Sequence, residues 1–204
     1  MNKKTIIDYA CLNRIFTTEQ IVKDLNIDNK SYFNTVMARL CNDNYIHRYE
    51  KGIYGICFKG KYIKQMFYPS EDEVINYLYL RDSEGFEAGA ELIRKIGLSS
   101  WMSNKRYVIT NKVKEKTIKC NCVLLPSPII IDKENINTLR ILNVLDNMDI
   151  LAVDTTEPYK IICNFIKEKR VDYNKLFELG EKYYSKSVVL KIYEAAKWEV
   201  CHAT

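Results

Sequence analysis

Apolar side chains recur at helical spacing through the N-terminal part of the chain, and their intervals predict three short helices over residues 2–12, 18–25 and 29–41. The first helix is expected to bury Ile6, Ile7, Ala10 and Cys11. The second is expected to turn inward Ile21, Val22 and Leu25. The third is expected to bury a single stripe of side chains, formed by Phe33, Val36, Met37 and Leu40.

Polar residues mark where the second and third of these helices begin. Thr17 and Gln20 have the spacing of a capping box, and Phe16 before the cap can pack on Ile21. Asp28 is expected to cap the third helix by accepting hydrogen bonds from its free backbone N–H groups. The two helices are therefore expected to be joined by a tight turn.

The solvent-facing side of the third predicted helix combines polar, aromatic and cationic side chains with no carboxylate. A solvated helix face normally includes glutamate, whereas a face without acids suits approach to the phosphates and base edges of DNA. The residues of this segment that we expect to contact DNA are Asn29, Lys30, Ser31, Tyr32, Asn34, Thr35 and Arg39.

Beyond this helix the pattern changes to β-rich runs at residues 45–49 and 53–58, which flank Glu50-Lys51-Gly52 and predict a hairpin. Two short helices joined by a tight turn and followed by a hairpin describe a winged helix-turn-helix. In that arrangement the second helix of the pair enters the major groove of DNA. The hairpin adds Arg48 and Lys51 to the expected DNA-binding residues.

The remainder of the chain predicts an α+β fold that is mainly helical, with a mixed α/β domain that becomes all-helical towards the C-terminus. Residues 1–68 are expected to form the winged helix-turn-helix domain, ending in a short connector, and residues 69–204 the second domain. Ser70 and Glu73 form another capping box, and Gly85-Phe86 is expected to interrupt the chain. The other expected elements are a helix over 88–96 ending at Gly97, strands over 106–110 and 117–124, a helix capped by Asp132, and helices over 159–169, 173–179 and 185–198.

The excess positive charge is confined to the N-terminal third. Residues 1–68 contain 11 Lys and Arg against 6 Asp and Glu, whereas the remaining residues contain 20 of each. The formal net charge of +5 therefore arises entirely before residue 69. Such asymmetry indicates an anionic partner for the N-terminal domain, and nucleic acid is the partner that the predicted motif favours.

Several other classes of protein are disfavoured. No apolar run reaches the roughly 18 residues of a membrane-spanning helix, and Asp8 interrupts the only apolar stretch near the start, so a cytoplasmic protein without a membrane partner is expected. The seven cysteines are scattered and odd in number, unlike a disulfide framework. Cys120 and Cys122 are expected to share one face of a strand, but zinc needs four ligands, so neither a metal site nor a cofactor is expected.

Four segments, in chain order, resemble the AbiEi-type antitoxins of bacterial type IV toxin–antitoxin systems. The first is the capped helix pair followed by Tyr49-Glu-Lys-Gly-Ile-Tyr54, and the second is the helix start Pro69-Ser70-Glu71-Asp72-Glu73. The third runs from Ala88 through Gly97-Leu98-Ser99-Ser100 to the strand at 106–111, with serines where the family commonly has threonines. The fourth is Leu142-Asn-Val-Leu-Asp146, and the last 50 residues match no quotable motif of the family.

The resemblance implies a transcriptional repressor that binds double-stranded DNA at its own promoter. It also implies a functional partner, a nucleotidyltransferase-like toxin that the second domain counteracts. Type IV antitoxins counteract the effect of the toxin without a stable complex, so direct contact with the toxin does not follow from the resemblance.

Two other classes of function stand beside this hypothesis. One is a non-enzymatic protein-interaction module, in which the basic N-terminal domain binds an acidic protein on a winged-helix scaffold. The other is an enzyme acting on nucleic acid or a nucleotide. The sequence holds only two histidines, His47 and His202, and none of the zinc-protease, P-loop or dinucleotide-binding motifs, so no catalytic residue is assigned and a non-enzyme is expected.

Overall fold

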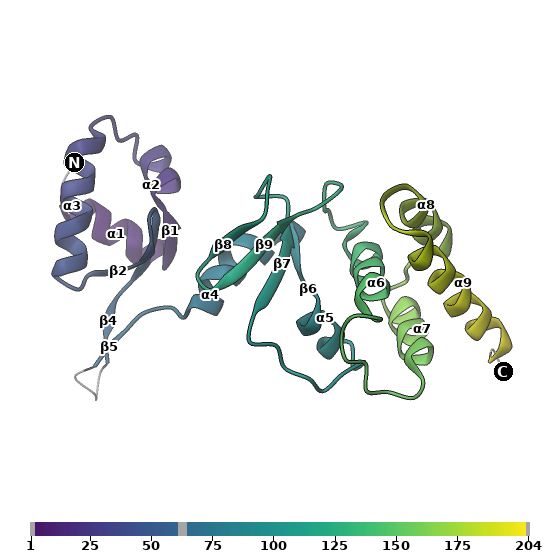
Figure 1. The fold of residues 1–204 in the computed structure, drawn as a ribbon. Coiled ribbons are helices and arrows are strands. Elements are labelled where there is room, and N and C mark those ends of the chain that lie inside the picture. The colour runs from purple at the N-terminus through teal and green to yellow at the C-terminus, as the bar shows by residue number, and fades with distance from the viewer. Residues whose placement is uncertain (1–2, 61–64, 203–204) are drawn as a thin grey trace. The chain divides into compact units, whose positions relative to one another are not determined.

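The computed structural model describes residues 3–60 and 65–202, which form two compact units of mixed α+β structure, Met1–Leu78 and Tyr79–Thr204 (Figure 1). The division falls after Leu78, beyond the position after residue 68 that the sequence suggested. None of the helices within the described ranges has the length and apolar character needed to cross a membrane.

The N-terminal unit begins with short helices and small strands (Figure 1). Its first elements are α1 (Lys3–Asn13), β1 (Ile15–Thr17), α2 (Thr18–Asp24), α3 (Lys30–Asn42), β2 (Ile46–Glu50) and β3 (Ile53–Ile56). The strands form an antiparallel sheet in the order β1-β3-β2. Then follow the paired strands β4 (Phe58–Lys59) and β5 (Met66–Phe67), and the short helix α4 (Glu71–Ile75).

One apolar core joins α1, α2 and α3 to the three-stranded sheet of this unit. The predicted stripe of α3 is fully confirmed, because Phe33, Val36, Met37 and Leu40 are all buried in this core. The ring of Phe16, before α2, stacks on that of Tyr54 in β3 with centroids 5.9 Å apart. Burial of these side chains holds α3 against the sheet, with its polar face outward.

Some local expectations for this unit are wrong. Cys11 is exposed, so α1 buries a narrower face around Ile6 and Ala10 than its spacing suggested. The segment before α2 was not expected to be a strand, yet β1 pairs with β3. Three residues are too few to show a strand periodicity, and only the partner strand makes the segment extended.

The start of α3 also differs from the sequence prediction, since its cap is Asn29 and not Asp28. The side-chain oxygen of Asn29 accepts a hydrogen bond of 2.9 Å from the backbone N–H of Tyr32. The capping boxes expected at Thr17 and at Ser70 are both confirmed. Sequence pattern therefore located the helix start to within one residue.

Replacing Asn29 by Ala is expected to lower the free energy of unfolding by about 1 kcal/mol, because the N–H of Tyr32 loses its acceptor. Asp28→Ala is the matched control and is expected to change stability by less than about 0.5 kcal/mol. Urea denaturation followed by circular dichroism measures both. A larger loss for Asp28→Ala than for Asn29→Ala would contradict the assigned cap.

The segment expected to be a plain connector, residues 59–68, takes part in a second antiparallel pair. Phe58 of β4 faces Phe67 of β5 in the register, and their rings stack with centroids 6.0 Å apart. Residues 61–64 of the expected connector lie outside the described residues. Just after this pair, the hydroxyl of Tyr49 donates a hydrogen bond to the carbonyl of Pro69, which ties the chain back to β2.

The C-terminal unit combines a sheet with a group of helices. A π-helical turn, η1 (Asn76–Leu80), spans the division between the units and is followed by a 3₁₀ turn, η2 (Arg81–Ser83). The sheet contains β6 (Gly85–Ala88), β7 (Arg106–Thr110), β8 (Thr117–Lys119) and β9 (Cys122–Pro126). The helices are α5 (Ala90–Lys95), α6 (Ile136–Asn147), α7 (Pro158–Glu168), α8 (Tyr173–Tyr183) and α9 (Lys186–Cys201).

The strands of this sheet lie in the order β6-β7-β9-β8, with a parallel pairing of β7 and β9 between two antiparallel pairings. Helices α5 and α6 pack on β6, and α9 contacts α6, α7 and α8 (Figure 1). The ammonium group of the buried Lys191 in α9 donates to the carbonyl of Leu145 at 2.7 Å and pairs with Asp149 at 2.6 Å. This contact joins the last helix to the end of α6.

Three sequence expectations for this unit are wrong. Gly85 and Phe86 belong to strand β6 and do not interrupt the chain. The strand expected over 117–124 is a hairpin, because Cys120 and Asn121 both have positive φ and turn the chain between β8 and β9. Asp132 does not cap α6 directly; its carboxylate closes a turn that precedes the helix. The left-handed conformation expected at Gly97 is confirmed, with φ of 86°, and it directly follows Ile96, the C-cap of α5.

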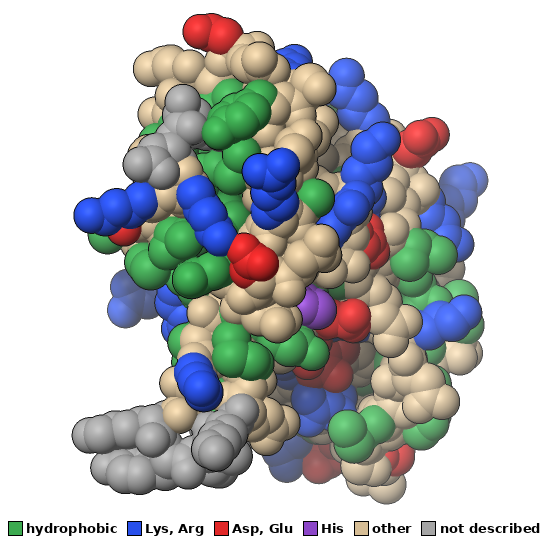
Figure 2. All heavy atoms as spheres, turned by 90° about the vertical axis from the view of Figure 1, so that its left-hand side faces the viewer, with side chains coloured by type: hydrophobic (Ala, Val, Ile, Leu, Met, Phe, Trp, Pro, Cys, Tyr) green, Lys and Arg blue, Asp and Glu red, His purple; other side chains and the backbone are tan. Residues whose placement is uncertain are grey.

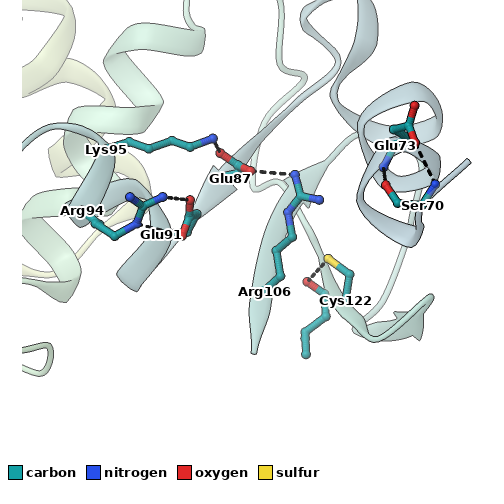
Figure 3. A network of polar contacts seen from close by, with 9 residues as sticks. Ser70, Glu73, Glu87, Glu91, Arg94, Lys95, Arg106 and Cys122 are labelled. Carbon is teal, nitrogen blue, oxygen red and sulfur yellow. Dashed lines mark hydrogen bonds and ion pairs between the residues drawn. The ribbon is translucent and has the colours of Figure 1, made fainter. Parts of the chain in front are cut away.

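An ion network links β6, β7 and α5 (Figure 3). The carboxylate of Glu87 accepts hydrogen bonds from Lys95 of α5 and from Arg106 of β7, the latter at 2.6 Å. Burial alone would raise the pKa of Glu87, but the bonds from Lys95 and Arg106 outweigh it, so the pKa lies below its ordinary value of 4.5.

Glu87→Gln is expected to lower the free energy of unfolding at pH 7 by about 1–3 kcal/mol, because two charge-assisted hydrogen bonds are weakened. A depressed pKa in the folded state means that the contribution is present above the ordinary pKa and is lost as the pH falls below it. The difference between variant and parent should therefore shrink as the pH falls below 4.5 and vanish once the pH lies below the depressed pKa of Glu87. Urea denaturation against pH measures it, with the exposed Glu115→Gln as control; a difference that persists at low pH would contradict the pairing.

Candidate nucleic-acid interface

All nine residues expected from the sequence to contact DNA are exposed. Seven lie on α3 or at its cap, on the side opposite the buried stripe, and two lie on the hairpin formed by β2 and β3. The exposed residues are Asn29, Lys30, Ser31, Tyr32, Asn34, Thr35, Arg39, Arg48 and Lys51. The exposed side of α3 in the folded chain is therefore the side that the sequence indicated.

A hollow of about 680 Å³, which we call the α3–hairpin groove, lies between α3, the start of α2 and the β2–β3 hairpin. Among the nine residues, it brings together Asn34 of α3 with Arg48 and Lys51 of the hairpin. Side chains of an α-helix advance by about 100° per residue, so Asn34 projects towards this groove while Tyr32 and Arg39 project to the other flank of α3. The structure thus separates the expected residues into two sets.

The second set does not line the groove. Asn29 and Tyr32 line a smaller hollow of about 370 Å³ near the start of α3, together with Asp28. Neither hollow is lined by Lys30, Ser31, Thr35 or Arg39, which stand on the open surface of the helix. An extended ligand that contacted all nine residues would have to span the whole exposed length of α3.

The hairpin is fixed to the start of α2 by the backbone. The N–H of Thr18 donates a hydrogen bond of 2.9 Å to the carbonyl of Gly52 at the hairpin turn. The first N–H groups of a helix have no partner within the helix, so this bond satisfies one of them and also orients the hairpin. Gly52 has φ of 85°, a conformation that other residues adopt only with strain. The positions of Arg48 and Lys51 therefore depend on a rigid turn.

Sequence reasoning missed several residues that line the groove, of which Thr18, Glu19, Ala38 and Asn42 are the most informative. Ala38 and Asn42 lie on the outward face of α3, where Ala38 leaves room for close approach. Their helical positions alone would have placed them on that face. Glu19 is a carboxylate on α2, and no feature of the pattern of α3 could have revealed that it faces the same groove.

Three of the four cations expected to contact DNA have no partner among the described residues, whereas Nε of Arg48 donates to the carbonyl of Glu50 at 3.3 Å. Among the described residues, no hydrogen bond or ion pair involves the side-chain cations of Lys30, Arg39 and Lys51, whereas Asp43 is neutralised by Lys3 at 2.6 Å. In Figure 2, Lys and Arg side chains (blue) stand out on the upper part of the face that the N-terminal unit turns to the viewer, with isolated carboxylates (red) between them. Such unpaired surface cations favour phosphate groups.

Two thiols near the groove are not set up as nucleophiles. Burial raises the pKa of Cys41 above its ordinary value, and nearby Arg48 offsets this only in part. Burial and the neighbouring Cys41 also raise the pKa of Cys57. Both thiols are therefore protonated at neutral pH, which does not suit covalent catalysis. Within the part of the chain that the structure describes, His, Cys, Asp and Glu form no group of three that could hold a metal ion.

Comparison with known proteins finds a likeness in structure and no match in sequence. No protein-family model and no curated protein sequence matches the chain. The chain is similar in structure to the RV2827C protein from Mycobacterium tuberculosis, with a TM-score of 0.52 and 9% sequence identity. The match covers 93% of this chain and 75% of the other. A likeness at this identity concerns the fold alone, so the resemblance to AbiEi-type antitoxins stays a prediction.

Proposed function

We propose that the N-terminal unit is a winged helix-turn-helix and that the protein is a DNA-binding transcriptional repressor. Helices α2 and α3 are the helix pair, α3 is the recognition helix, and the β2–β3 hairpin is the wing. The observation that carries the proposal is the carboxylate-free exposed face of α3, with its cations unpaired, next to a groove that Arg48 and Lys51 share.

The proposal extends to the antitoxin of a type IV toxin–antitoxin pair. In this role the protein represses its own operon and counteracts a nucleotidyltransferase-like toxin in the cytoplasm. The support is the order of the four AbiEi-like segments along the chain. A nucleotidyltransferase-like protein encoded beside this gene is expected under this proposal; its expression should arrest growth, and expression of this chain should restore it. Persistent arrest would refute the antitoxin role and leave the repressor role untouched.

The repressor role is tested by binding to the region upstream of its own gene. Fluorescence anisotropy with labelled duplex DNA should show affinity that falls steeply between about 50 and 200 mM salt, because each neutralised phosphate releases counterions. A shuffled duplex of the same composition is the control and should bind more weakly at every salt concentration. Equal affinity for both duplexes would limit the activity to non-specific binding, and no binding would refute it.

A protein-interaction module on the same scaffold is the second candidate function. The observation in its favour is a set of large apolar side chains exposed on the N-terminal unit, namely Leu12, Tyr32, Tyr45, Phe58, Phe67 and Tyr68. Exposed aromatic residues are common anchors of protein interfaces. If the upstream DNA is not bound, this function replaces the first.

A further inference from the structure

A hollow of about 490 Å³ lies in the C-terminal unit, and nothing in the proposed DNA-binding role uses it. We call it the α6 cleft. Its lining includes Gly89, at the junction of β6 and α5, and the aromatic residues Trp101 and Tyr107. The lining also includes three polar residues of α6, Asn143, Asp146 and Asn147. The volume is within the usual range for ligand pockets.

The amide of Asn143 provides a hydrogen-bond donor in this cleft. The side chain is only 8% exposed, and its oxygen accepts a hydrogen bond of 3.1 Å from the backbone N–H of Gly89. A backbone N–H can only donate, so this bond fixes which end of the amide faces Gly89. The NH₂ group forms no hydrogen bond with another described residue and is not fully enclosed, so it can donate to an acceptor on a bound ligand.

The cleft has one uncompensated negative charge. Asp146 is exposed and forms no ion pair with any described residue, and no Lys or Arg lines the cleft. Other carboxylates of this region are occupied: Asp149 pairs with Lys191 at 2.6 Å, and Asp154 accepts hydrogen bonds from the N–H and hydroxyl of Ser100. In addition, Asn147 donates to the carbonyl of Asn143, which leaves the side-chain oxygen of Asn147 as an acceptor.

The charge and hydrogen-bonding groups of the α6 cleft disfavour phosphorylated and purely apolar ligands and favour a guanidinium group. A phosphorylated ligand would bring negative charge to a cleft that has a carboxylate and no cation. A purely apolar ligand would leave the Asn143 donor and the Asp146 carboxylate without partners. A guanidinium group is planar and always charged, stacks on aromatic rings, and donates to carboxylates in a fixed geometry.

The rim of the cleft indicates that such a group would come from a polypeptide. Met102 and Ile150, adjacent in sequence to lining residues, are 74% and 81% exposed, and Trp101 is 49% exposed. Trp, Met and Arg are enriched at protein interfaces, where the contacts that surround a central residue exclude water from it. A peptide backbone also supplies the carbonyl that the NH₂ group of Asn143 lacks.

We propose that the α6 cleft binds an arginine side chain of a partner polypeptide, with the guanidinium against Trp101 and Asp146 and a main-chain carbonyl on Asn143. This inference is independent of DNA binding, because it uses only residues of the C-terminal unit. A lysine would fit less well, since its ammonium group lacks the planar fork that matches a carboxylate and an aromatic face together.

The test uses the full chain with Trp198→Phe, which leaves Trp101 as the sole tryptophan. The probes are the capped tripeptide Gly-Arg-Gly and the same peptide with citrulline, which has nearly the same shape but no charge. Emission of Trp101 should change saturably with the arginine peptide, and its affinity should exceed that of the citrulline peptide about tenfold. Equal affinities, or no saturable change, would overturn the proposal.

Two variants test whether Asp146 is responsible for binding of the arginine peptide. Asp146→Asn should lower the affinity for the arginine peptide to that for the citrulline peptide, while Glu178→Gln, an equal change of charge on the exposed face of α8, should leave it unchanged. Coincident thermal unfolding of both variants and the parent establishes that folding is intact. An equal loss of affinity in both variants would overturn the assignment of Asp146. Tighter binding of free arginine than of the capped peptide would overturn the inference that the arginine belongs to a polypeptide.

Discussion

The triple variant Lys30→Ala, Arg39→Ala, Lys51→Ala is expected to bind the upstream DNA about a hundredfold more weakly than the parent at about 0.15 M salt. Each cation is exposed and unpaired among the described residues, so each is available to a phosphate. Because bound phosphates release counterions, removing one cation that neutralises a phosphate should weaken binding about fivefold at this salt concentration. The slope of log affinity against log salt should also fall by about 0.9 for each phosphate no longer neutralised, which anisotropy titrations at several salt concentrations measure.

A matched triple variant of the C-terminal unit separates a local contact from the effect of net charge. Lys114, Lys116 and Lys133 are exposed, and within the described parts of the chain their side chains form no hydrogen bond or ion pair. Their replacement by Ala removes the same charge and should change the affinity by less than about threefold, since under the proposed docking these lysines neutralise no phosphate. If both triple variants lose affinity equally, the docking of α3 and the hairpin on DNA is wrong.

Phe33→Ala is expected to lower the free energy of unfolding by about 3–5 kcal/mol. The ring of Phe33 is 1% exposed and belongs to the core that holds α3 against the rest of the N-terminal unit. Removing it leaves a cavity as well as losing the burial of apolar area. Urea denaturation followed by circular dichroism measures the loss.

The neighbouring residue supplies the control for this prediction. Tyr32 lies on the exposed side of the same helix turn, so Tyr32→Ala should change stability by less than about 1 kcal/mol. Under the proposed function, Tyr32→Ala should instead weaken DNA binding. Similar losses of stability in the two variants would show that α3 does not pack through the Phe33 stripe.

Much of the local structure could be predicted from the sequence, because it depends on contacts between residues close in the chain. The buried stripe of α3 follows from the helical repeat, and the capping boxes at Thr17 and Ser70 follow from side chains that bond backbone groups three residues away. The left-handed glycine that ends α5, Gly97, likewise involves a single turn of chain. In each case the residues that decide the structure are neighbours in sequence.

Elements that depend on distant partners were predicted less well. Strand β1 exists because it pairs with β3, and the extended backbone at Gly85 is fixed by pairing with Thr110. The turn at Cys120-Asn121 needs two non-glycine residues with positive φ, which the β-rich composition of the run concealed. These segments are extended because they form hydrogen bonds with strands distant in the sequence, and the residues within each segment do not indicate this pairing.

The sequence alone therefore determined which face of α3 is polar and cationic, where the excess charge lies, and that a hairpin follows, since these depend on periodicity and composition. Only the tertiary structure decided that Glu19 and Asn42 share a groove with Arg48, and that Trp101, Asn143 and Asp146 line one cleft. Such groupings arise when segments far apart in the chain are brought together by burial of the apolar cores. Burial depends on the whole fold, and no spacing along the chain encodes it.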